Sequence, residues 1–274
     1  MLSTACTGFA LNISVFRKFS KKKKGKKTNA DKLITSLACA DIIFCLGVIV
    51  NSVILLSECS YYRKPLLIYW NISQGTSFSG SLLHIIAISI DRLVAVIHPI
   101  QYKNRSDPCK IHLGILAIWV LSLIVASTQF YLSLVVIDII VCAMIVIASL
   151  EAIVIYSIIA RYLFKRTKAL AMDKKQMKKR LKSCKKSICL CALLTIAFFT
   201  CNLPFVVFNI CVDFGAGKFT KEAIHALYYL LTINCVVDPI IYNFASKLLK
   251  FLSKKLIKKK ESSRKTETQT LVSF

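Results

Sequence analysis

Seven stretches of mainly apolar residues divide the chain, and polar segments of different character separate them. Every stretch after the first is long enough, as a helix, to cross the roughly 30 Å hydrocarbon layer of a bilayer. A β-barrel would instead show alternating segments of about ten residues. The pattern predicts an all-α membrane protein, with a seven-transmembrane helix bundle over residues 1–244. The predicted helices span residues 2–16, 33–56, 66–97, 111–131, 134–164, 188–212 and 223–244.

The two ends of this pattern differ from the rest. Only about fourteen residues precede the first basic loop, fewer than the roughly 20 that a spanning helix needs. We therefore expect the first helix to be truncated at its outer end. After the bundle come an amphipathic run over residues 245–258 and a polar segment over residues 259–274. We expect the second of these to be a disordered cytoplasmic tail.

Composition and charge agree with a membrane protein. Of the 274 residues, 56% are hydrophobic and 19% charged, and the net charge is +25. All but four of the 38 Lys and Arg residues lie on one predicted side of the bundle. Because short loops rich in Lys and Arg stay cytoplasmic, the C-terminus is expected inside and the N-terminus outside, in the plasma membrane. The cations then set the topology and contact anionic lipids, and no nucleic acid is expected as a partner.

The twelve cysteines do not indicate a disulfide framework. All except Cys59 and Cys211 lie within predicted helices or on the cytoplasmic side, where thiols stay reduced. Cys189 and Cys191 are two residues apart on a predicted helix and point to different faces, so they do not form a zinc site. Metal chemistry of that kind is not supported.

Several polar residues lie inside the apolar stretches at comparable depth. A charge there costs at least about 2.5 to 3.5 kcal/mol unless it faces a partner or water. Together these side chains offer oxygen ligands to a hard monovalent cation such as sodium, or to a buried water cluster. The alternative is a hydrogen-bonded contact between helices with no ion. The residues are Asn12, Asp41, Ser81, Asn234 and Asp238.

Two prolines, Pro204 and Pro239, lie within predicted helices. Each removes one backbone hydrogen bond and favours a kink. Polar neighbours accompany both, and they can satisfy the freed carbonyl groups in more than one arrangement.

Six short motifs follow one another in order along the chain. They are centred on Asn12, on Leu37 to Asp41, on Asp91-Arg92-Leu93, on Trp119, on Phe198 with the segment 201–204, and on Asp238 to Tyr242. Together they resemble the motifs of rhodopsin-like G-protein-coupled receptors, and the resemblance covers essentially all 274 residues. The fifth resembles the Phe-x-x-Cys-Trp-x-Pro motif, with Asn202 in place of Trp, and the run 245–258 resembles the family's interfacial eighth helix.

Departures from the family pattern point to a branch. No Cys stands near Leu67, almost nothing joins the fourth and fifth helices after Tyr131, and no Pro stands near Ala148. With the Asp-Pro-x-x-Tyr motif, these features resemble the melanocortin, adenosine and cannabinoid receptors.

The resemblance implies a ligand pocket at the outer end of the bundle, but not its ligand. Gln74 replaces the Asp that pairs with an ammonium in amine receptors, and no Lys in the seventh helix could hold retinal. The resemblance therefore leads us to expect an orphan receptor with an extracellular small molecule, lipid or peptide as its ligand. The candidate pocket residues are Gln74, Phe78, Asp138, Phe205, Phe208, Asn209, Tyr228 and Tyr229.

The resemblance also implies an activation switch. Asp91 would hold Arg92 in the resting state, and an outward swing of helix six about Pro204 would release it. The residues implied in this switch are Asp91, Arg92, Tyr156, Phe198, Pro204, Pro239 and Tyr242. Arg92, Pro99 and Ile100 would contact the G protein, and arrestin is a further expected partner.

The sequence favours a receptor that signals to a cytoplasmic heterotrimeric G protein, with sodium as a negative allosteric modulator and no other cofactor. No residue set suits covalent chemistry, so an enzyme is not expected, and we expect His84 and Ser89 only to pack between helices. Two alternatives stay open. One is a non-signalling receptor remnant or dimerisation partner, and the other is an ion or solute transporter.

Overall fold

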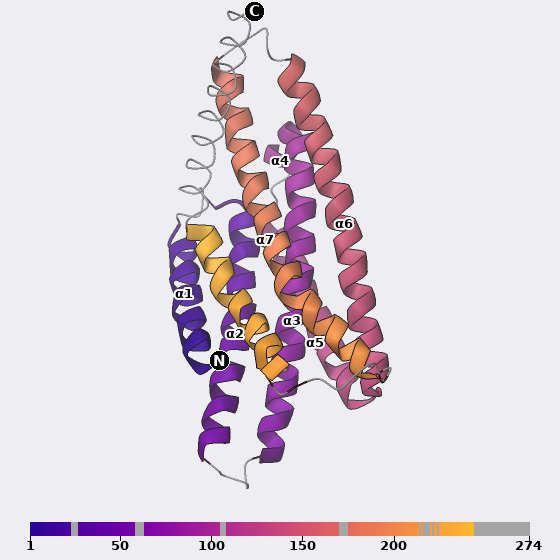
Figure 1. Ribbon diagram of the computed structural model, residues 1–274. Coiled ribbons are helices and arrows are strands. Elements are labelled where there is room, and N and C mark those ends of the chain that lie inside the picture. Colours follow the sequence, from indigo (N-terminus) through magenta and orange to yellow (C-terminus); the bar gives the residue numbers. More distant parts are fainter. Residues whose placement is uncertain are drawn as a thin grey trace, which may run out of the picture.

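The computed structural model describes residues 1–22, 27–57, 63–104, 108–169, 175–213, 215, 220, 222–223 and 225–243. In this part of the chain the regular elements are helices, arranged as an elongated bundle (Figure 1). The predicted all-α membrane fold is confirmed. In chain order the elements are α1 Leu2–Ser20, α2 Asn29–Ser57, α3 Arg63–Ile97, the short α4 Pro99–Asn104, α5 Pro108–Ser127, the 3-10 turn η2 Thr128–Phe130, α6 Leu134–Ala169 and α7 Lys175–Asp213.

Residues 225–243 form one further helix, which we call the last helix. It packs against α1 although the two are far apart in sequence: Asn12 donates a hydrogen bond to the Cys235 carbonyl at 2.8 Å, and the Phe19 and Tyr242 rings meet edge to face at 6.4 Å. Counted along the bundle, α5, α6, α7 and the last helix are the fourth to seventh long helices. We name the two ends of the bundle after the elements they carry, the α4 end and the η2 end.

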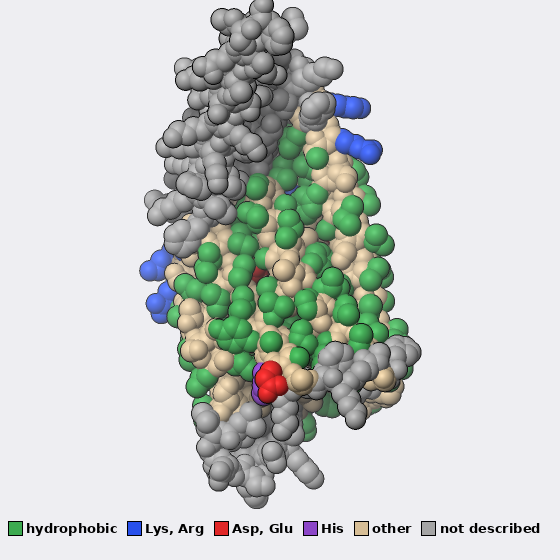
Figure 2. Space-filling model, viewed as in Figure 1, with side chains coloured by type: hydrophobic (Ala, Val, Ile, Leu, Met, Phe, Trp, Pro, Cys, Tyr) green, Lys and Arg blue, Asp and Glu red, His purple; other side chains and the backbone are tan. Residues whose placement is uncertain are grey.

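Five of the described helices are long and apolar enough to cross a membrane, in α2, α3, α5, α6 and α7. The middle of the molecule presents a broad belt of apolar side chains, with Lys and Arg side chains at its upper right and on its left flank (Figure 2). The five spans are buried to different degrees: 61% of the best window of α2 but only 11% of that of α5 is buried within the protein. The chain is a multi-pass membrane protein in which α2 is central and α5 faces lipid.

Several predicted helix boundaries need correction, because hydropathy marks the part of a helix that lies in lipid and not its ends. α1 continues to Ser20 instead of residue 16, α6 continues to Ala169 instead of 164, and α7 begins at Lys175 instead of 188. The added residues are rich in Lys and Arg, which are good helix formers in water. The short helix α4 was not predicted at all.

The start of α2 is set by a capping box that the hydropathy pattern does not register. The Thr28 backbone N–H donates to the Asp31 carboxylate at 2.9 Å, and the Asp31 N–H donates to the Thr28 hydroxyl at 3.2 Å. Lys22 also pairs with Asp31 at 2.8 Å, closing the connection from α1. These bonds satisfy backbone donors at a helix start, so α2 begins at Asn29 and not at residue 33.

A buried hydrogen-bond chain fastens α2, α3 and α5 together. The Trp119 indole N–H donates to the Ser36 hydroxyl at 2.9 Å, and that hydroxyl lies 2.8 Å from His84 Nε2. His84 Nδ1 lies 2.6 Å from the Gly80 carbonyl, so His84 fits as a neutral ring with its proton on Nδ1. This chain fixes the rotation of α3, the helix that carries most of the candidate site.

Candidate functional site

The α4 end of the bundle holds a charged pair near the end of α3. Arg92 and Asp91 form a salt bridge, and Arg92 Nε donates to Asp91 Oδ2 at 3.1 Å. Their side chains are only 12% and 9% exposed. Adjacent residues project about 100° apart on a helix, so the pair is held by the bend of the guanidinium toward the carboxylate.

A third side chain, Tyr102 of α4, completes this group, and the sequence reasoning missed it. Its hydroxyl donates to the Asp91 carboxylate, with Oδ1 at 2.9 Å and Oδ2 at 3.1 Å, and accepts from Arg92 Nη2 at 3.2 Å. Burial raises the pKa of the Tyr102 phenol, and the charge of Asp91 raises this pKa further. The phenol therefore stays protonated at neutral pH and remains a donor. We name Asp91, Arg92 and Tyr102 the switch triad.

The other predicted switch residues lie between the triad and the middle of the bundle. The Tyr156 hydroxyl of α6 lies 3.3 Å from the Ser89 hydroxyl of α3 and 3.4 Å from the Thr195 hydroxyl of α7. Ser89 is thus joined to α6 and α7 through this tyrosine. The hydroxyl of the buried Tyr242 has no hydrogen-bond partner in the described structure.

Phe198 and the two helical prolines occupy the middle of the bundle. Phe198 is 1% exposed and its ring packs against that of Phe78 at 5.9 Å. Pro204 lies inside α7, and Pro239 lies inside the last helix, which continues past it to residue 243. Of the residues expected to meet the G protein besides Arg92, Pro99 is exposed at the start of α4. The side chain of Ile100 lies outside the described residues.

The five polar residues expected to share one depth are all buried within the bundle. Asn12, Asp41, Ser81, Asn234 and Asp238 are between 0% and 6% exposed. Asp41 and Asp238 lie close enough for their charges to interact, and Ser81 reaches Asp41 as a hydrogen-bond partner. Within the described residues, one oxygen each of Asn12, Asp41 and Asn234 and both carboxylate oxygens of Asp238 lack a partner. We name these five residues the polar cluster.

The donor set of the polar cluster suits a hard monovalent cation better than a transition metal. Its free atoms are carboxylate and amide oxygens, which are the ligands that hard cations prefer. Among the described residues no group of three or more His, Cys, Asp or Glu could hold a metal ion. The unsatisfied oxygens fit sodium or ordered water.

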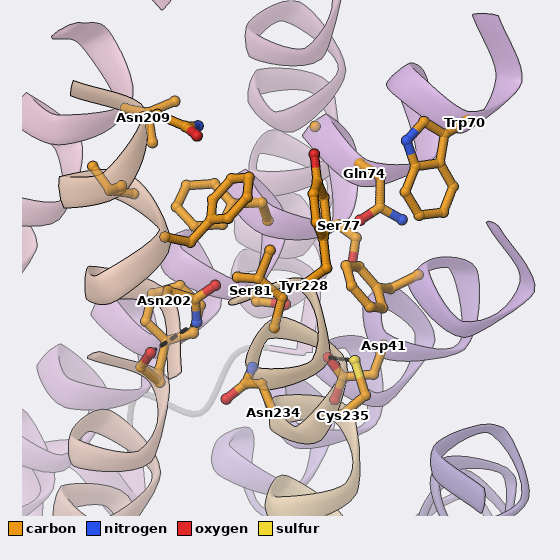
Figure 3. A pocket seen from close by; sticks show the side chains of 18 of the residues that line it. Asp41, Trp70, Gln74, Ser77, Ser81, Asn202, Asn209, Tyr228, Asn234 and Cys235 are labelled. Atoms are coloured by element: carbon orange, nitrogen blue, oxygen red, sulfur yellow. Dashed lines mark hydrogen bonds between the residues drawn. The ribbon is translucent and has the colours of Figure 1, made fainter. Parts of the chain in front are cut away.

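A cavity of about 220 Å³ opens between α2, α3, α6, α7 and the last helix (Figure 3). Gln74, Phe78, Asp138, Phe205, Asn209 and Tyr228 of the predicted pocket all line it. Trp70, Asp138 and Asn209 lie close to the helix ends that face the η2 end. The part of the cavity around these three residues, which we call its upper part as drawn in Figure 3, therefore faces the η2 end, opposite the switch triad.

Two residues assigned to the pocket from the sequence do not line it. Phe208 is absent from the lining, and Tyr229 is 42% exposed on the outside of the last helix. Their neighbours Asn209 and Tyr228 do line the cavity. One residue along a helix turns the side chain by about 100°, and here that turn carries Phe208 and Tyr229 out of the lining.

The cavity also includes residues that were expected to form a separate site. Asp41, Ser81 and Asn234 of the polar cluster line the same space as Gln74 and Phe205, together with Asn202 and Cys235. Asn202 is 4% exposed, and its Nδ2 donates to the Phe198 carbonyl at 2.7 Å (Figure 3). Its side chain thus folds back along α7 and leaves the passage to Asp41 open.

One contact crosses the upper part of the cavity. Asn209 Nδ2 of α7 donates to Asp138 Oδ1 of α6 at 3.3 Å, while the Phe205 and Tyr228 rings meet at 5.2 Å. The buried Gln74 Nε2 has no partner among the described residues. Six of the nineteen lining residues are aromatic, and polar groups lie at both ends, which is the arrangement of a small-molecule site.

Comparison with known proteins identifies the family to which this architecture belongs. A family model described as 7 transmembrane receptor (rhodopsin family) matches residues 11–148 and 133–242. Human Substance-K receptor is 24% identical over 245 residues, covering 79% of this chain and 61% of that receptor. Human and bovine G-protein coupled receptor 39 are 31% and 30% identical over 123 residues, which cover 43% of this chain and 27% of each relative. The matched part of the chain thus spans less than two thirds of each of these relatives.

Proposed function

Because the chain belongs to the rhodopsin family of seven-transmembrane receptors, we propose that it carries the signal of an extracellular ligand to a cytoplasmic heterotrimeric G protein. Members of this family are receptors and not enzymes. The observation that carries the proposal is the course of α3: Gln74 and Phe78 line the cavity, and Asp91 and Arg92 of the same helix form the switch triad with Tyr102. One rigid element therefore connects a ligand site to a charged switch at the opposite end.

The proposed orientation places the α4 end in the cytoplasm and the η2 end outside, in the plasma membrane. It rests on the sequence, in which all but four of the 38 Lys and Arg residues fall in segments predicted for the cytoplasmic side. The N-terminus is then extracellular and the C-terminus cytoplasmic. The same cations would contact anionic lipids at the inner leaflet.

Activation in this proposal is an outward swing of α7 about Pro204. In the resting state the switch triad holds Arg92 against α3 and α4, while Tyr156 joins α3 to α7 through Ser89 and Thr195. These hydrogen bonds are long, at 3.3 and 3.4 Å, so their loss costs little. The swing frees Arg92 and opens a cleft for the G protein.

The freed Arg92 then needs new partners. Tyr242 fits this role, because its hydroxyl is buried and unsatisfied in the described structure and an arginine is a strong donor. Pro239, three residues earlier, gives the last helix the freedom to bring Tyr242 toward α3. Arg92, Pro99 and Ile100 would line the surface for the G protein, and arrestin would use the same cleft.

We further propose that the polar cluster binds sodium in the resting state. Its unpartnered oxygens come from α1, α2 and the last helix, so an ion there would join helices that have to move relative to one another. A ligand that binds one state more tightly shifts the equilibrium toward that state. Sodium would in this way act as a negative allosteric modulator.

Substitution of Arg92 tests the proposal. Signal should be measured as guanine-nucleotide exchange on a panel of purified G proteins, with the full chain in nanodiscs at matched receptor amounts. Arg92→Ala should abolish exchange, and Asp91→Asn should raise it without ligand, because an unpaired Arg92 leaves α3 more easily. Arg161→Ala, which removes an exposed arginine at the same end of α6, is the matched control and should signal like the parent.

The opposite outcomes are equally informative. If Arg92→Ala exchanges nucleotide as well as the parent, Arg92 is not the switch. If the correctly folded parent activates no G protein, the non-signalling remnant replaces the receptor as the function of this chain.

A further inference from the structure

The cavity and the polar cluster form one continuous space, and this continuity limits which ligands suit the site. Residues at the η2 end, such as Gln74 and Asn209, and Asp41 in the middle of the bundle line the same cavity (Figure 3). We propose that the ligand is a small elongated organic cation whose charged group pairs with Asp41 and displaces sodium there. This inference rests on the proposed receptor function and names the chemical class of its ligand.

The passage to Asp41 is open because of Asn202. Its amide group is fixed to the Phe198 carbonyl one turn earlier in α7 and does not extend across the cavity. An indole at this position would be far larger than a carboxamide and would fill the space between Phe198 and Phe205. A ligand can therefore enter from the η2 end, pass Asn202 and reach the carboxylate below it.

The charge of the lining selects a cation. Asp41 and Asp138 line the cavity, and no Lys, Arg or His does so among the described residues. Asp41 is 1% exposed and one of its oxygens has no partner, and the nearby Asp238 is also unpaired in the described structure. Two buried carboxyl groups need a proton or a cation to offset the loss of water. An anionic ligand would be repelled.

The shape and the walls of the cavity define the rest of the ligand. Its volume of about 220 Å³ is below the roughly 300 to 1,000 Å³ of sites for drug-sized ligands, so the buried ligand has to be small. The aromatic rings of Phe78, Phe198, Phe205 and Tyr228 surround the path between the two polar ends. These rings favour a flat apolar body, and they attract a cation that passes over their faces.

Asp138, the second carboxylate of the lining, is a less suitable partner for the cation. It already accepts a hydrogen bond from Asn209 at 3.3 Å. It also lies close to the η2 end, at the fifth residue of α6, where water can screen its charge. Asp41 is the deeper of the two and has an unpartnered oxygen, so an ion pair there is stronger.

Binding of a defined probe pair tests the inference without any G protein. The probes are radiolabelled 3-phenylpropylammonium and the uncharged 3-phenylpropanol, and the receptor is the full chain in nanodiscs. The ammonium should bind the parent more tightly than the alcohol. Asp41→Asn should weaken binding of the ammonium at least about tenfold, because a buried charge loses its partner. Asp138→Asn should weaken binding less than Asp41→Asn does, and Glu222→Gln, which removes an exposed carboxylate outside the cavity lining, should bind like the parent.

Two further arms examine the passage and the ion. Asn202→Trp should abolish binding of the ammonium, while Val207→Trp, on the lipid-facing side of the same helix at 50% exposure, should bind like the parent. Raising sodium from about 0.01 M to about 0.15 M at constant ionic strength should weaken ammonium binding to the parent. The same change should have no effect on Asp41→Asn.

Several results would overturn the inference. Equal affinities for the ammonium and the alcohol would show that charge is not recognised. Full binding to Asp41→Asn, or loss of binding in Asp138→Asn instead, would place the cation elsewhere. Failure here leaves the receptor proposal untouched, since that proposal depends on nucleotide exchange and on Arg92.

Discussion

Tyr102→Phe is the most selective test of the switch triad, because it removes one hydroxyl and keeps the ring. That hydroxyl donates to Asp91 at 2.9 Å and accepts from Arg92 at 3.2 Å. A hydrogen bond to a charged group contributes about 1.5 to 3 kcal/mol. Tyr102 is only partly buried, so we take a lower value of about 1 to 1.5 kcal/mol.

This energy converts directly into a change of basal activity. In the proposed mechanism the triad stabilises the resting state, so losing about 1 to 1.5 kcal/mol there favours the active state about five- to thirteenfold. If the active fraction is small in the parent, basal nucleotide exchange should rise by the same factor. Because the pKa of the Tyr102 phenol is raised above its ordinary value, the hydroxyl stays protonated from mildly acidic to mildly alkaline pH. The effect should therefore not vary with pH in that range.

The assay is guanine-nucleotide exchange without ligand, at equal receptor density in nanodiscs. The control is Tyr131→Phe, the same chemical change at a tyrosine that is 86% exposed after η2, far from the triad. It should leave basal exchange unchanged. If Tyr102→Phe has parental or lower exchange while remaining folded, then Tyr102 stabilises no resting state and the energetic argument fails.

Three further predictions concern the topology, the polar cluster and the core. An epitope tag on Phe274 should be stained only after cells are permeabilised, and staining of intact cells would reverse the proposed orientation. Raising sodium should lower basal exchange in the parent but not in Asp41→Asn, whereas equal sensitivity in both would exclude an ion at Asp41. Ser36→Ala should lower the unfolding free energy by about 2 kcal/mol, because the Trp119 indole N–H and the buried His84 Nε2 lose their shared hydroxyl. Thermal unfolding checks this against Ser52→Ala, which removes only a local bond within α2; equal melting temperatures would contradict it.

The fold could be predicted from hydropathy because lipid leaves the backbone little choice. A spanning segment has to satisfy its own polar groups, so a long apolar stretch becomes a helix. The same argument does not apply outside the bilayer. There the ends of helices depend on local contacts such as the capping box of Thr28 and Asp31. Short helices such as α4 also form there without a long run of apolar residues. The sequence contains the Thr-x-x-Asp pattern of a helix N-cap at residues 28–31, and this pattern predicts the start of α2.

Single positions of the site depended on helix phase and on contacts between distant segments. Residues 208 and 209 both fall at pocket depth, and only packing decides which of the two points inward. Tyr102 was missed for another reason. Its role exists only because α4 folds back against α3, which places Tyr102 of α4 against Asp91, eleven residues earlier in α3.

The polar cluster and the predicted ligand pocket share one cavity. Whether two such sites are continuous depends on the empty space between side chains, and a list of residue types does not give that space. Asn202 was visible in the sequence as a departure from the family's Trp, yet its consequence depends on where the amide goes. A side chain that extended toward Tyr228 would close the space. The bond to the Phe198 carbonyl holds it against α7 instead, and Asp41 then lines the same cavity as Gln74. A sodium site and a ligand site that share one carboxylate cannot be occupied independently. A ligand that reaches Asp41 would therefore compete with the proposed sodium ion, and the receptor's response to the ion and to the ligand should change together when Asn202 is replaced.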